Sequence, residues 1–313
     1  NYDIDAVHFD DYFYPYPEND KVFNDAAQFA AYGKGMTLAN WRRSNIDALV
    51  RDLGIRIKAI KPHVEFGISP FAVWRNAGTD PAGSPTTAGA QTYDDLYADT
   101  RKWAQTGMVD YILPQIYWHH DHPAAPYDGI ADWWVKKTRG ARVNLYIGQA
   151  SYRVGSNAKE WANPRELVSH LDYNQRHGGA IKGNVYFSAK SVATNPLDAH
   201  GLIARGWYQK AALTPTMPWI DAIPPAPVKR ARWKGDQIRW NGSRNAAQYL
   251  VYRIEKPAAE VISCDIADTR NLVTIVNAPI TMARITSGKD KGVTYLVSAV
   301  DRGSNESGAV VVQ

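Results

Sequence analysis

The sequence predicts an α/β protein whose first part is built on a parallel sheet and whose second part is all β. Between residues 1 and 210, an apolar run, a polar loop and a helical repeat follow one another five times. Residues 211–228 are rich in proline and lack periodicity, which indicates a linker. From residue 229 to 313, short alternating segments separated by turns predict an immunoglobulin-like sandwich without helices.

The composition narrows the class of protein. Hydrophobic residues make up 45% of the 313 residues and charged residues 21%, as in an ordinary globular protein. No apolar run approaches the roughly 18 residues of a membrane span, and we expect none. The net charge of +5 is scattered rather than gathered in a stripe, so nucleic acid is not an expected partner. The single cysteine, Cys264, excludes an intrachain disulfide.

Aromatic residues are the most informative part of the composition. The chain has 11 Trp and 18 Tyr against 7 Phe. Amphipathic rings of this kind line clefts that stack on sugar rings, and large barrels also bury many rings. Composition alone leaves both readings open.

Five strand–helix units are expected in the first part. The first joins a strand at residues 3–9 to a helix that begins near Trp41 and stops at Pro62. The other four strands are predicted at 63–71, 109–118, 141–150 and 181–190, and their helices at 92–107, 130–140, 164–178 and 196–209. Strands and helices in this alternation predict a parallel sheet with right-handed crossovers.

The position of the unusual residues favours a (β/α)8 barrel over a doubly wound sheet. Polar and aromatic side chains follow each predicted strand at its C-terminal end, where such a barrel builds its active site. No glycine-rich phosphate loop follows any strand, which argues against a nucleotide-binding sheet. The residues at these ends are Asp10 and Asp11, Trp74 and Arg75, Gln115 and Trp118, Gln149 and Arg153, and Ser188 and Lys190.

Several segments carry a resemblance to a known family. The sequence DAVHFDDYFYPYP at residues 5–17 resembles the glycosyl-hydrolase-like 10 family of bacterial envelope or secreted proteins, which are related to peptidoglycan glycan-strand hydrolases. The tail YLVSAVDRGSNES at 295–307 resembles fibronectin type III modules. The first resemblance continues in the same order through FGISPFAVWRN (66–76), YDDLYADTRKWAQTGMVDYILPQIYW (93–118), LYIGQASYR (145–153) and GGAIKGNVYFSAK (178–190).

The resemblance implies which part of a barrel this chain holds. In that family HFDDYFYP looks like the end of strand four, so the chain is expected to hold about strands four to eight. Strands one to three are then expected before Asn1, or another chain completes the wall. A secreted, periplasmic or lipoprotein-anchored location in a bacterium is implied as well.

Glycoside hydrolysis commonly needs two carboxyl groups across the scissile bond. Asp10 and Asp11 are the strongest candidates, because they end a strand beside aromatic residues. Being adjacent, they point to opposite sides, so we expect one to face the barrel axis and the other to brace a loop. Asp121 is the candidate partner, followed by Asp128 or a carboxylate outside this chain. Glu65 and Asp110 lie at strand starts and are expected to serve stability.

The remaining candidates are expected to bind substrate. Gln115 is expected to donate hydrogen bonds to a sugar hydroxyl and Trp118 to stack on the ring. Arg75 or Arg153 is expected to meet an N-acetyl carbonyl or a lactyl carboxylate. The full set of substrate-binding candidates is Tyr12, Trp74, Arg75, Gln115, Tyr117, Trp118, Tyr152 and Arg153.

A metal site at His119, His120 and His122, with Asp121, is the reading we disfavour. Three histidines within four residues rarely converge on one ion without a distant ligand, and no HExxH pattern is present. No metal and no cofactor are predicted.

Two functions from different classes remain. The first is a glycoside hydrolase that cleaves O-glycosidic bonds in a bacterial cell-wall or related amino-sugar polysaccharide by carboxylate chemistry. The alternative is a carbohydrate-binding protein on a barrel scaffold without catalysis.

Overall fold

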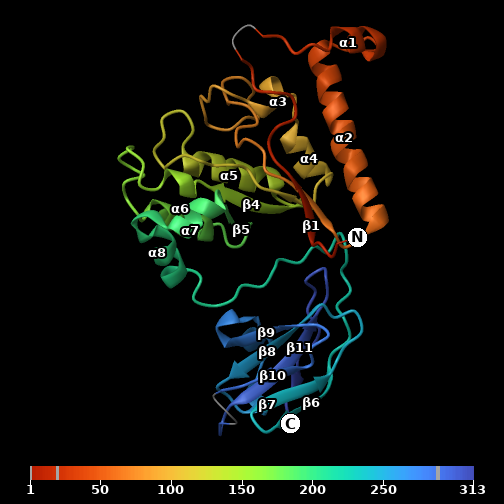
Figure 1. Cartoon of the computed structure of the whole chain (residues 1–313), viewed down its shortest axis with the longest axis vertical. Coiled ribbons are helices and arrows are strands. Elements are labelled where there is room, and N and C mark those ends of the chain that lie inside the picture. Colours follow the sequence, from red (N-terminus) through yellow and green to blue (C-terminus); the bar gives the residue numbers. More distant parts are fainter. Residues whose placement is uncertain (1, 19–20, 287–289) are drawn as a thin grey trace. The chain divides into compact units, whose positions relative to one another are not determined.

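The computed structural model describes residues 2–18, 21–286 and 290–313. The chain divides into two compact units, Asn1–Arg205 and Gly206–Gln313 (Figure 1). None of the helices in the described ranges is long and apolar enough to cross a lipid bilayer.

The first unit contains the predicted parallel sheet. Its strands are β1 (Ala6–Phe9), β2 (Glu65–Ile68), β3 (Tyr111–Ile112), β4 (Asn144–Gln149) and β5 (Ile181–Tyr186). They pair in the order β1-β2-β3-β4-β5, and every pairing is parallel. This order lacks the reversal that defines a doubly wound sheet. It is the order that one side of a barrel requires, and the described residues form an open five-stranded sheet.

The third strand is much shorter than its sequence predicts. The expected strand 109–118 pairs only at Tyr111 and Ile112. Pro114 follows and has no N–H to donate to the ladder. Pairing resumes at Gln115, which bridges Phe71 on one side and Gly148 on the other. The interruption lets the chain bend while Gln115 stays in the plane of the sheet edge.

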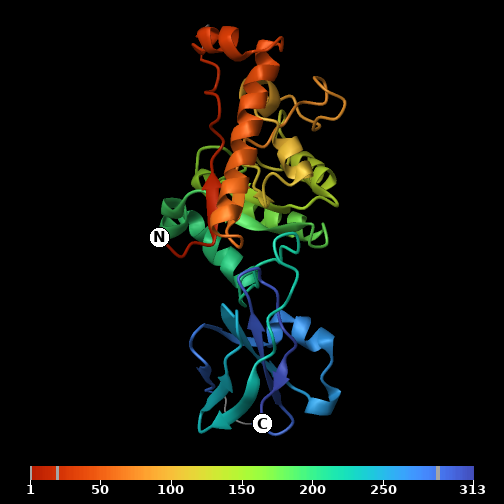
Figure 2. The same ribbon diagram turned by 90° about the vertical axis from the view of Figure 1, so that its right-hand side faces the viewer.

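The described part of the first unit contains helices as well as the sheet. They are α1 (Ala26–Tyr32), α2 (Leu38–Ile60), α3 (Thr92–Asp95), α4 (Thr100–Thr106), α5 (Tyr127–Thr138), α6 (Glu166–Gln175), α7 (Ala189–Thr194) and α8 (Ala199–Gly206). Of these, α5 contacts β4 and α6 contacts β5. The long helix α2 runs beside β1 in both views (Figures 1 and 2). Thr37 caps it by accepting a hydrogen bond from the Asn40 amide at 3.3 Å.

Two expected helices are broken. The helix predicted at 92–107 is divided into α3 and α4, with Tyr97 between them at a φ of 52°. Asp99 begins α4 by accepting from the Lys102 amide, and Gly107 ends it at a φ of 69°, as a C-terminal glycine should. The helix predicted at 196–209 is α8 alone. The helix before it, α7, occupies the end of the expected strand 181–190. Asn195, in the left-handed region, ends α7 and so separates it from α8.

The core lies between the sheet and the helices. Strand side chains alternate between two faces, and on the helical side those of the three central strands are 0–1% exposed. Trp134 of α5 lies among them and donates its indole N–H to the Ala72 carbonyl at 2.8 Å. The buried strand residues are Phe66, Ile68, Ile112, Leu145 and Ile147.

The other face of the sheet carries a polar and aromatic layer. His8 and Tyr111 stack with ring centroids 5.8 Å apart and an interplanar angle of 9°. The Tyr111 ring crosses Gly67 so closely that a Cβ there would lie 2.1 Å from it. Tyr146 meets the other side of Tyr111 edge-on at 5.8 Å. A glycine at position 67 is therefore required by the space that this ring occupies.

A buried ion pair fixes the long connection between β1 and α2. The Arg42 guanidinium donates to both carboxylate oxygens of Asp25, at 2.6 and 2.8 Å, and both side chains are less than a tenth exposed. Arg42 also donates to the Tyr97 hydroxyl at 2.9 Å. The hydrogen bonds from Arg42 hold the pKa of Asp25 below its usual value.

The second unit is a sandwich of two antiparallel sheets. One has the order β10 (Met282–Arg284), β7 (Gln237–Asn241), β6 (Lys229–Lys234). The other has the order β12 (Val310–Val311), β11 (Thr294–Val300), β8 (Gln248–Ile254), β9 (Leu272–Asn277). Trp240, Tyr249 and Tyr295 fill the space between them. The β-sandwich expected from the alternating segments is confirmed.

The expectation of a helix-free second part is wrong. A short helix, α9 (Ser263–Ala267), lies in the connection from β8 to β9. The Asp265 carboxylate accepts from the Ile262 amide at 2.9 Å and so caps its first turn. Part of the expected linker groups with this unit, because Met217 is 2% exposed and Asn305 donates to the Asp221 carbonyl at 3.1 Å. The boundaries 1–210, 211–228 and 229–313 stay a prediction.

Replacing Asp25 by Asn should destabilise the first unit by about 3–5 kcal/mol at neutral pH, because Arg42 stays buried without its counter-charge. The native pKa of Asp25 is lowered, so its stabilisation is present above the unfolded pKa and disappears as the pH falls through the native one. The difference between wild type and variant should therefore shrink in acid. Urea denaturation at neutral pH and at acid pH measures the free energy of unfolding of both proteins.

Asp52→Asn is the matched control, because the Arg51–Asp52 pair is more than half exposed. This change should alter stability by less than about 0.5 kcal/mol. Equal losses from the two variants would contradict the role given to the buried pair.

Candidate active site

The C-terminal edge of the sheet gathers side chains from three neighbouring strands. Asp10 follows β1, Ser69 follows β2 and Gln115 lies beyond β3. The parallel register pairs Phe9 with Ile68, so Asp10 and Ser69 come next to each other. The predicted convergence of Asp10 and Gln115 is present in the structure.

Asp10 is exposed and held through one oxygen. Its Oδ1 accepts hydrogen bonds from Gln115 Nε2 at 2.7 Å, from the Asp11 amide at 3.0 Å and from Ser69 Oγ at 3.2 Å. Gln115 Nε2 also donates to the Ser69 carbonyl at 2.7 Å, which fixes the orientation of the amide. Within the described residues, Oδ2 of Asp10 accepts no hydrogen bond. One oxygen is therefore anchored while the other is left for a ligand.

A hydrogen-bonded chain leads from Asp10 to the layer on the open face of the sheet. Ser69 Oγ, which donates to Asp10, lies 2.9 Å from His8 Nε2, and His8 Nδ1 lies 3.0 Å from the Tyr111 hydroxyl. With Ser69 donating to Asp10, His8 donates from Nε2 and accepts from Tyr111 at Nδ1. Ser69 and His8 are not predictable as parts of this site, because neither residue type marks a carboxylate site by itself.

Asp11 points the other way and is only 7% exposed. Its Oδ2 accepts a hydrogen bond from the Tyr16 hydroxyl at 2.6 Å. Burial raises the pKa of Asp11, the Tyr16 hydrogen bond opposes this rise, and the nearby charge of Asp10 adds to it. The two neighbours thus divide as expected: Asp10 is presented at the sheet edge, and Asp11 braces the loop.

Two groups of aromatic rings border Asp10. On one side Tyr16 contacts Tyr12 and Phe71, and Phe71 contacts Trp118 edge-on with centroids 5.5 Å apart. Tyr12 is 71% exposed and Trp118 is half-buried. These rings come from the loops after β1, β2 and β3. They form one wall of contacting rings, which includes Tyr16, whose hydroxyl is within reach of the charge of Asp10.

The second group lies after β3, β4 and β5. Tyr117 stacks on Phe187 with centroids 6.1 Å apart, and Tyr152 meets both rings edge-on. Burial, and then the charge of Asp10, raise the pKa of the Tyr117 hydroxyl, which places this ring near the carboxylate. Arg153 donates to the Tyr152 hydroxyl at 3.3 Å. Tyr152 and Phe187 are about half exposed.

Trp74 and Arg75 do not belong to these walls. Trp74 is 1% exposed, donates its indole N–H to Asp99 at 2.9 Å and stacks on Trp133, so it has no face for a sugar. Arg75 is bound by Asp94 and Asp80 at 2.7–3.0 Å. The expectation that they line the cleft is wrong, because the chain turns after Phe71 and directs both toward the helices.

The other carboxylates lie elsewhere. Asp121 is exposed in the loop before α5, and within the described residues it forms no hydrogen bond with Asp10. Asp110 accepts from Lys58 and the Phe66 amide, as a stability role predicts. Glu65 has a pKa raised to about 7, chiefly by burial and then by Asp110. It begins β2, about 13 Å along the strand from Ser69 at roughly 3.3 Å per residue.

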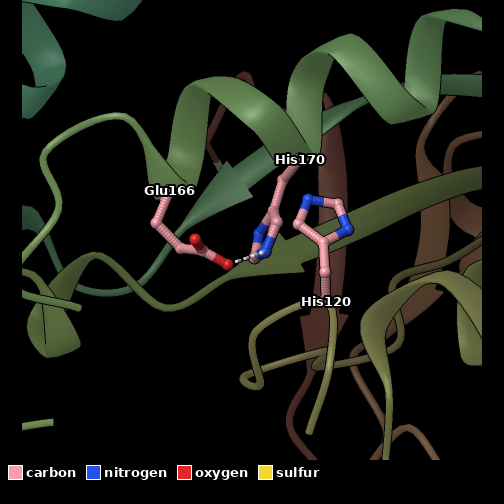
Figure 3. Close-up of side chains that lie close together, drawn as sticks. All are labelled: His120, Glu166 and His170. Carbon is pink, nitrogen blue, oxygen red and sulfur yellow. Dashed lines mark ion pairs between the residues drawn. The ribbon is translucent and has the colours of Figure 1, made fainter. Parts of the chain in front are cut away.

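A polar cluster is formed by His120, in the loop before α5, and by Glu166 and His170 of α6 (Figure 3). Their ligand atoms all lie within 4.8 Å of one another. Burial lowers the pKa of His170, whereas Glu166 opposes this effect. Burial would raise the pKa of Glu166, but the hydrogen bond and charge of His170 bring it below its usual value.

The cluster differs from the histidine group considered in the sequence. The ring centroids of His119 and His122 are 5.3 Å apart, and those of His122 and Trp118 are 6.0 Å apart. His120 instead contacts His170 of α6. Glu166 and His170 are four residues apart and so lie on one face of a helix, which is the sequence pattern that indicates this cluster. The neighbouring residues His119, His120 and His122 do not reveal it, because only His120 belongs to it.

An exposed carboxylate between aromatic rings, at the C-terminal edge of a parallel α/β sheet, is typical of the class of proteins that process glycans. Residues 1–163 match the glycosyl hydrolase-like 10 family, and the chain belongs to this family. The resemblance seen in the sequence is thus confirmed.

Two named relatives support this membership. Glycosyl hydrolase YngK from Bacillus subtilis is 42% identical over 322 residues, which cover 99% of this chain and 62% of YngK. Glycosyl hydrolase DigH from Escherichia coli K12 is 45% identical over 180 residues, covering 55% of this chain and 40% of DigH. The chain therefore spans about three fifths of the length of YngK and two fifths of that of DigH.

One solved structure is similar to a part of the chain at a low level. It is an Fn3-like protein from Clostridium thermocellum, 20% identical, with 29% of this chain and 91% of that protein covered. The TM-score is 0.20. This value is too low to bear on the fold.

Replacing Tyr16 by Phe should raise the pKa of Asp11 further. The Tyr16 hydroxyl donates to the charged form of this carboxyl and so stabilises it. Carbon-detected NMR titration of the Asp11 carboxyl measures the change. Tyr12→Phe is the control, since Tyr12 contacts Tyr16 only through its ring. An Asp11 pKa that stays constant or falls in Tyr16→Phe would contradict the assignment.

Proposed function

We propose that this chain is part of a glycoside hydrolase that cleaves O-glycosidic bonds in a bacterial cell-wall or related amino-sugar polysaccharide. The observation that carries the proposal is the presentation of Asp10, with one oxygen anchored and the other without a hydrogen bond in the described residues, near the aromatic rings of Tyr16 and Tyr117. Membership of a family whose relatives are named glycosyl hydrolases supports it.

Asp10 is the proposed catalytic carboxylate. An oxocarbenium-like transition state carries positive charge at the anomeric carbon, and a fixed carboxylate stabilises it or attacks it. Gln115 and Ser69 restrict the rotation of Asp10, which lowers the cost of reaching the reactive geometry. Asp11, buried and bound by Tyr16, is proposed to hold the loop rather than to touch substrate.

The partner carboxylate is proposed to come from Asp121 or from barrel strands outside this chain. A retaining mechanism needs the two carboxyl groups about 5–5.5 Å apart, and an inverting one about 6.5–9.5 Å. The open edges of β1 and β5 are where further strands would join the sheet. This placement keeps the Asp10 edge facing into a completed barrel.

The aromatic walls are proposed to hold the sugar rings. Trp118 and Tyr117 offer half-buried rings, one from each aromatic group, and the apolar faces of sugars stack on such rings. Arg153, beside Tyr152, is proposed to meet an N-acetyl carbonyl or lactyl carboxylate. The seven-stranded sandwich is proposed to be a fibronectin type III-like module, and the protein to act outside the cell or in its envelope.

In the full-length protein, Asp10→Asn should reduce turnover of denuded peptidoglycan or amino-sugar glycans by about 10²–10⁴-fold, because the charge is lost while the shape is kept. Reducing-end release measures turnover, and thermal unfolding should remain near that of the wild type. Asp121→Asn, measured alongside, reports whether Asp121 supplies the second carboxyl group. Asp52→Asn, on the exposed face of α2, is the control for handling and folding.

The alternative function has a distinct outcome. A protein that only binds glycans would show no turnover in the wild type while glycan binding remains measurable. Wild-type turnover in both Asp10→Asn and Asp11→Asn would remove these residues from the chemistry.

Replacing Trp118 by Ala should weaken binding of an amino-sugar oligosaccharide by about 0.5–1.5 kcal/mol, or roughly two- to tenfold in Kd. Trp74→Phe should lower thermal stability and leave the Kd unchanged, because Trp74 is buried. Isothermal titration calorimetry separates the two effects. A weaker Kd in Trp74→Phe with no change in Trp118→Ala would reverse the assignment of the walls.

A further inference from the structure

We propose that His120, Glu166 and His170 form a zinc site that fastens the loop between β3 and α5 to helix α6. The proposal rests on the geometry of the three side chains and is independent of the glycosidase function. Figure 3 shows them converging from two segments of the chain, with Glu166 and His170 on α6 and His120 on the loop.

His170 supplies the first ligand atom. Its side chain is fully buried, and its Nδ1 lies 2.9 Å from Gln149 Oε1. The Gln149 amide donates both of its hydrogens elsewhere, to the Tyr127 hydroxyl at 2.8 Å and to Asn184 Oδ1 at 2.9 Å. Its carbonyl oxygen therefore faces His170, which must carry its hydrogen on Nδ1. The lone pair of His170 is left on Nε2.

That lone pair faces another electron-pair donor. His170 Nε2 is buried, and Glu166 Oε1 lies 3.3 Å from it. A neutral imidazole nitrogen and a carboxylate oxygen repel each other unless a proton or a metal cation lies between them. With zinc–ligand bonds of about 2.0–2.2 Å, tetrahedral geometry separates two ligand atoms by about 3.3–3.5 Å. The observed separation meets this requirement.

His120 supplies the third ligand atom. Its Nδ1 is bound by the Asp128 carboxylate, and its Nε2 lies 3.0 Å from Ser169 Oγ. The Ser169 hydroxyl also approaches the Glu166 carbonyl at 2.7 Å, and its single hydrogen serves one acceptor at a time. With that hydrogen on the carbonyl, the lone pair of His120 Nε2 lacks a donor. A cation bound by His120 Nε2 would accept this lone pair in place of the missing hydrogen bond.

The surroundings match those of known zinc ligands. A histidine that binds zinc usually donates its other nitrogen to a carboxylate or carbonyl oxygen, as His120 does to Asp128 and His170 to Gln149. Two imidazoles and one carboxylate favour zinc over magnesium or calcium, which prefer oxygen ligands. Glu166 and His120 remain partly exposed, at 12% and 24%, so an ion and a water as fourth ligand have access.

Zinc titration of the full chain tests the proposal. The protein is produced without a polyhistidine tag, treated with chelator and titrated with zinc chloride in a calorimeter. The expected result is one zinc per chain, with Glu166→Gln and His120→Asn each at least about 100-fold weaker. Zinc should also raise the thermal unfolding temperature of the wild type, and not that of these two variants.

His177→Asn is the matched control. His177 also lies near the end of α6 and pairs with a carboxylate, Asp132, at 3.2 Å, but it lacks a third ligand. This variant should keep wild-type zinc affinity. Cobalt substitution gives a second readout, since tetrahedral Co²⁺ absorbs visible light more strongly than octahedral Co²⁺. The proposal would be overturned if the chelator-treated wild type failed to bind stoichiometric zinc. It would also be overturned if Glu166→Gln and His120→Asn bound zinc with wild-type affinity.

Discussion

The parallel pairing of β1, β2 and β3 is the constraint on which the rest of the site depends. Backbone hydrogen bonds set Phe9 against Ile68 and Gly67 against Tyr111. This register brings Asp10, Ser69 and Gln115 to one level without any attraction between their side chains. A slip of one residue would turn Asp10 toward the helices and bury its charge. The chemistry at the edge is therefore fixed by the ladder beneath it.

Polar contacts on both faces of the sheet stabilise this edge. On the open face, Tyr111, His8 and Ser69 form a chain that ends on Asp10. On the helical face, Gln149 at the end of β4 holds His170 of α6. Buried polar groups are costly unless each finds a partner, so the two networks favour one arrangement of strands and helices. The aromatic walls lie on loops that begin where these networks end.

Much of the sheet follows from the sequence, because its signals are local and periodic. The five units, their parallel order and the meeting of Asp10 with Gln115 were all predictable. The break at Tyr97 was not, since the apolar spacing of 92–107 continues through it and the interruption depends on the tertiary contact of Arg42 with Tyr97. Trp74 was placed wrongly because its partner, Asp99, lies 25 residues away. The Ser69 and His120 contacts are likewise non-local.

The close contact between Gly67 and the Tyr111 ring links two positions that are 44 residues apart. A side chain at position 67 would displace the ring and with it the hydroxyl that holds His8. Through Ser69, the displacement would reach Asp10. The two sites cannot vary independently during evolution: a larger residue at 67 requires a smaller one at 111. Covariation of positions 67 and 111 among relatives would show that the Tyr111 ring occupies the space that a side chain at position 67 would need.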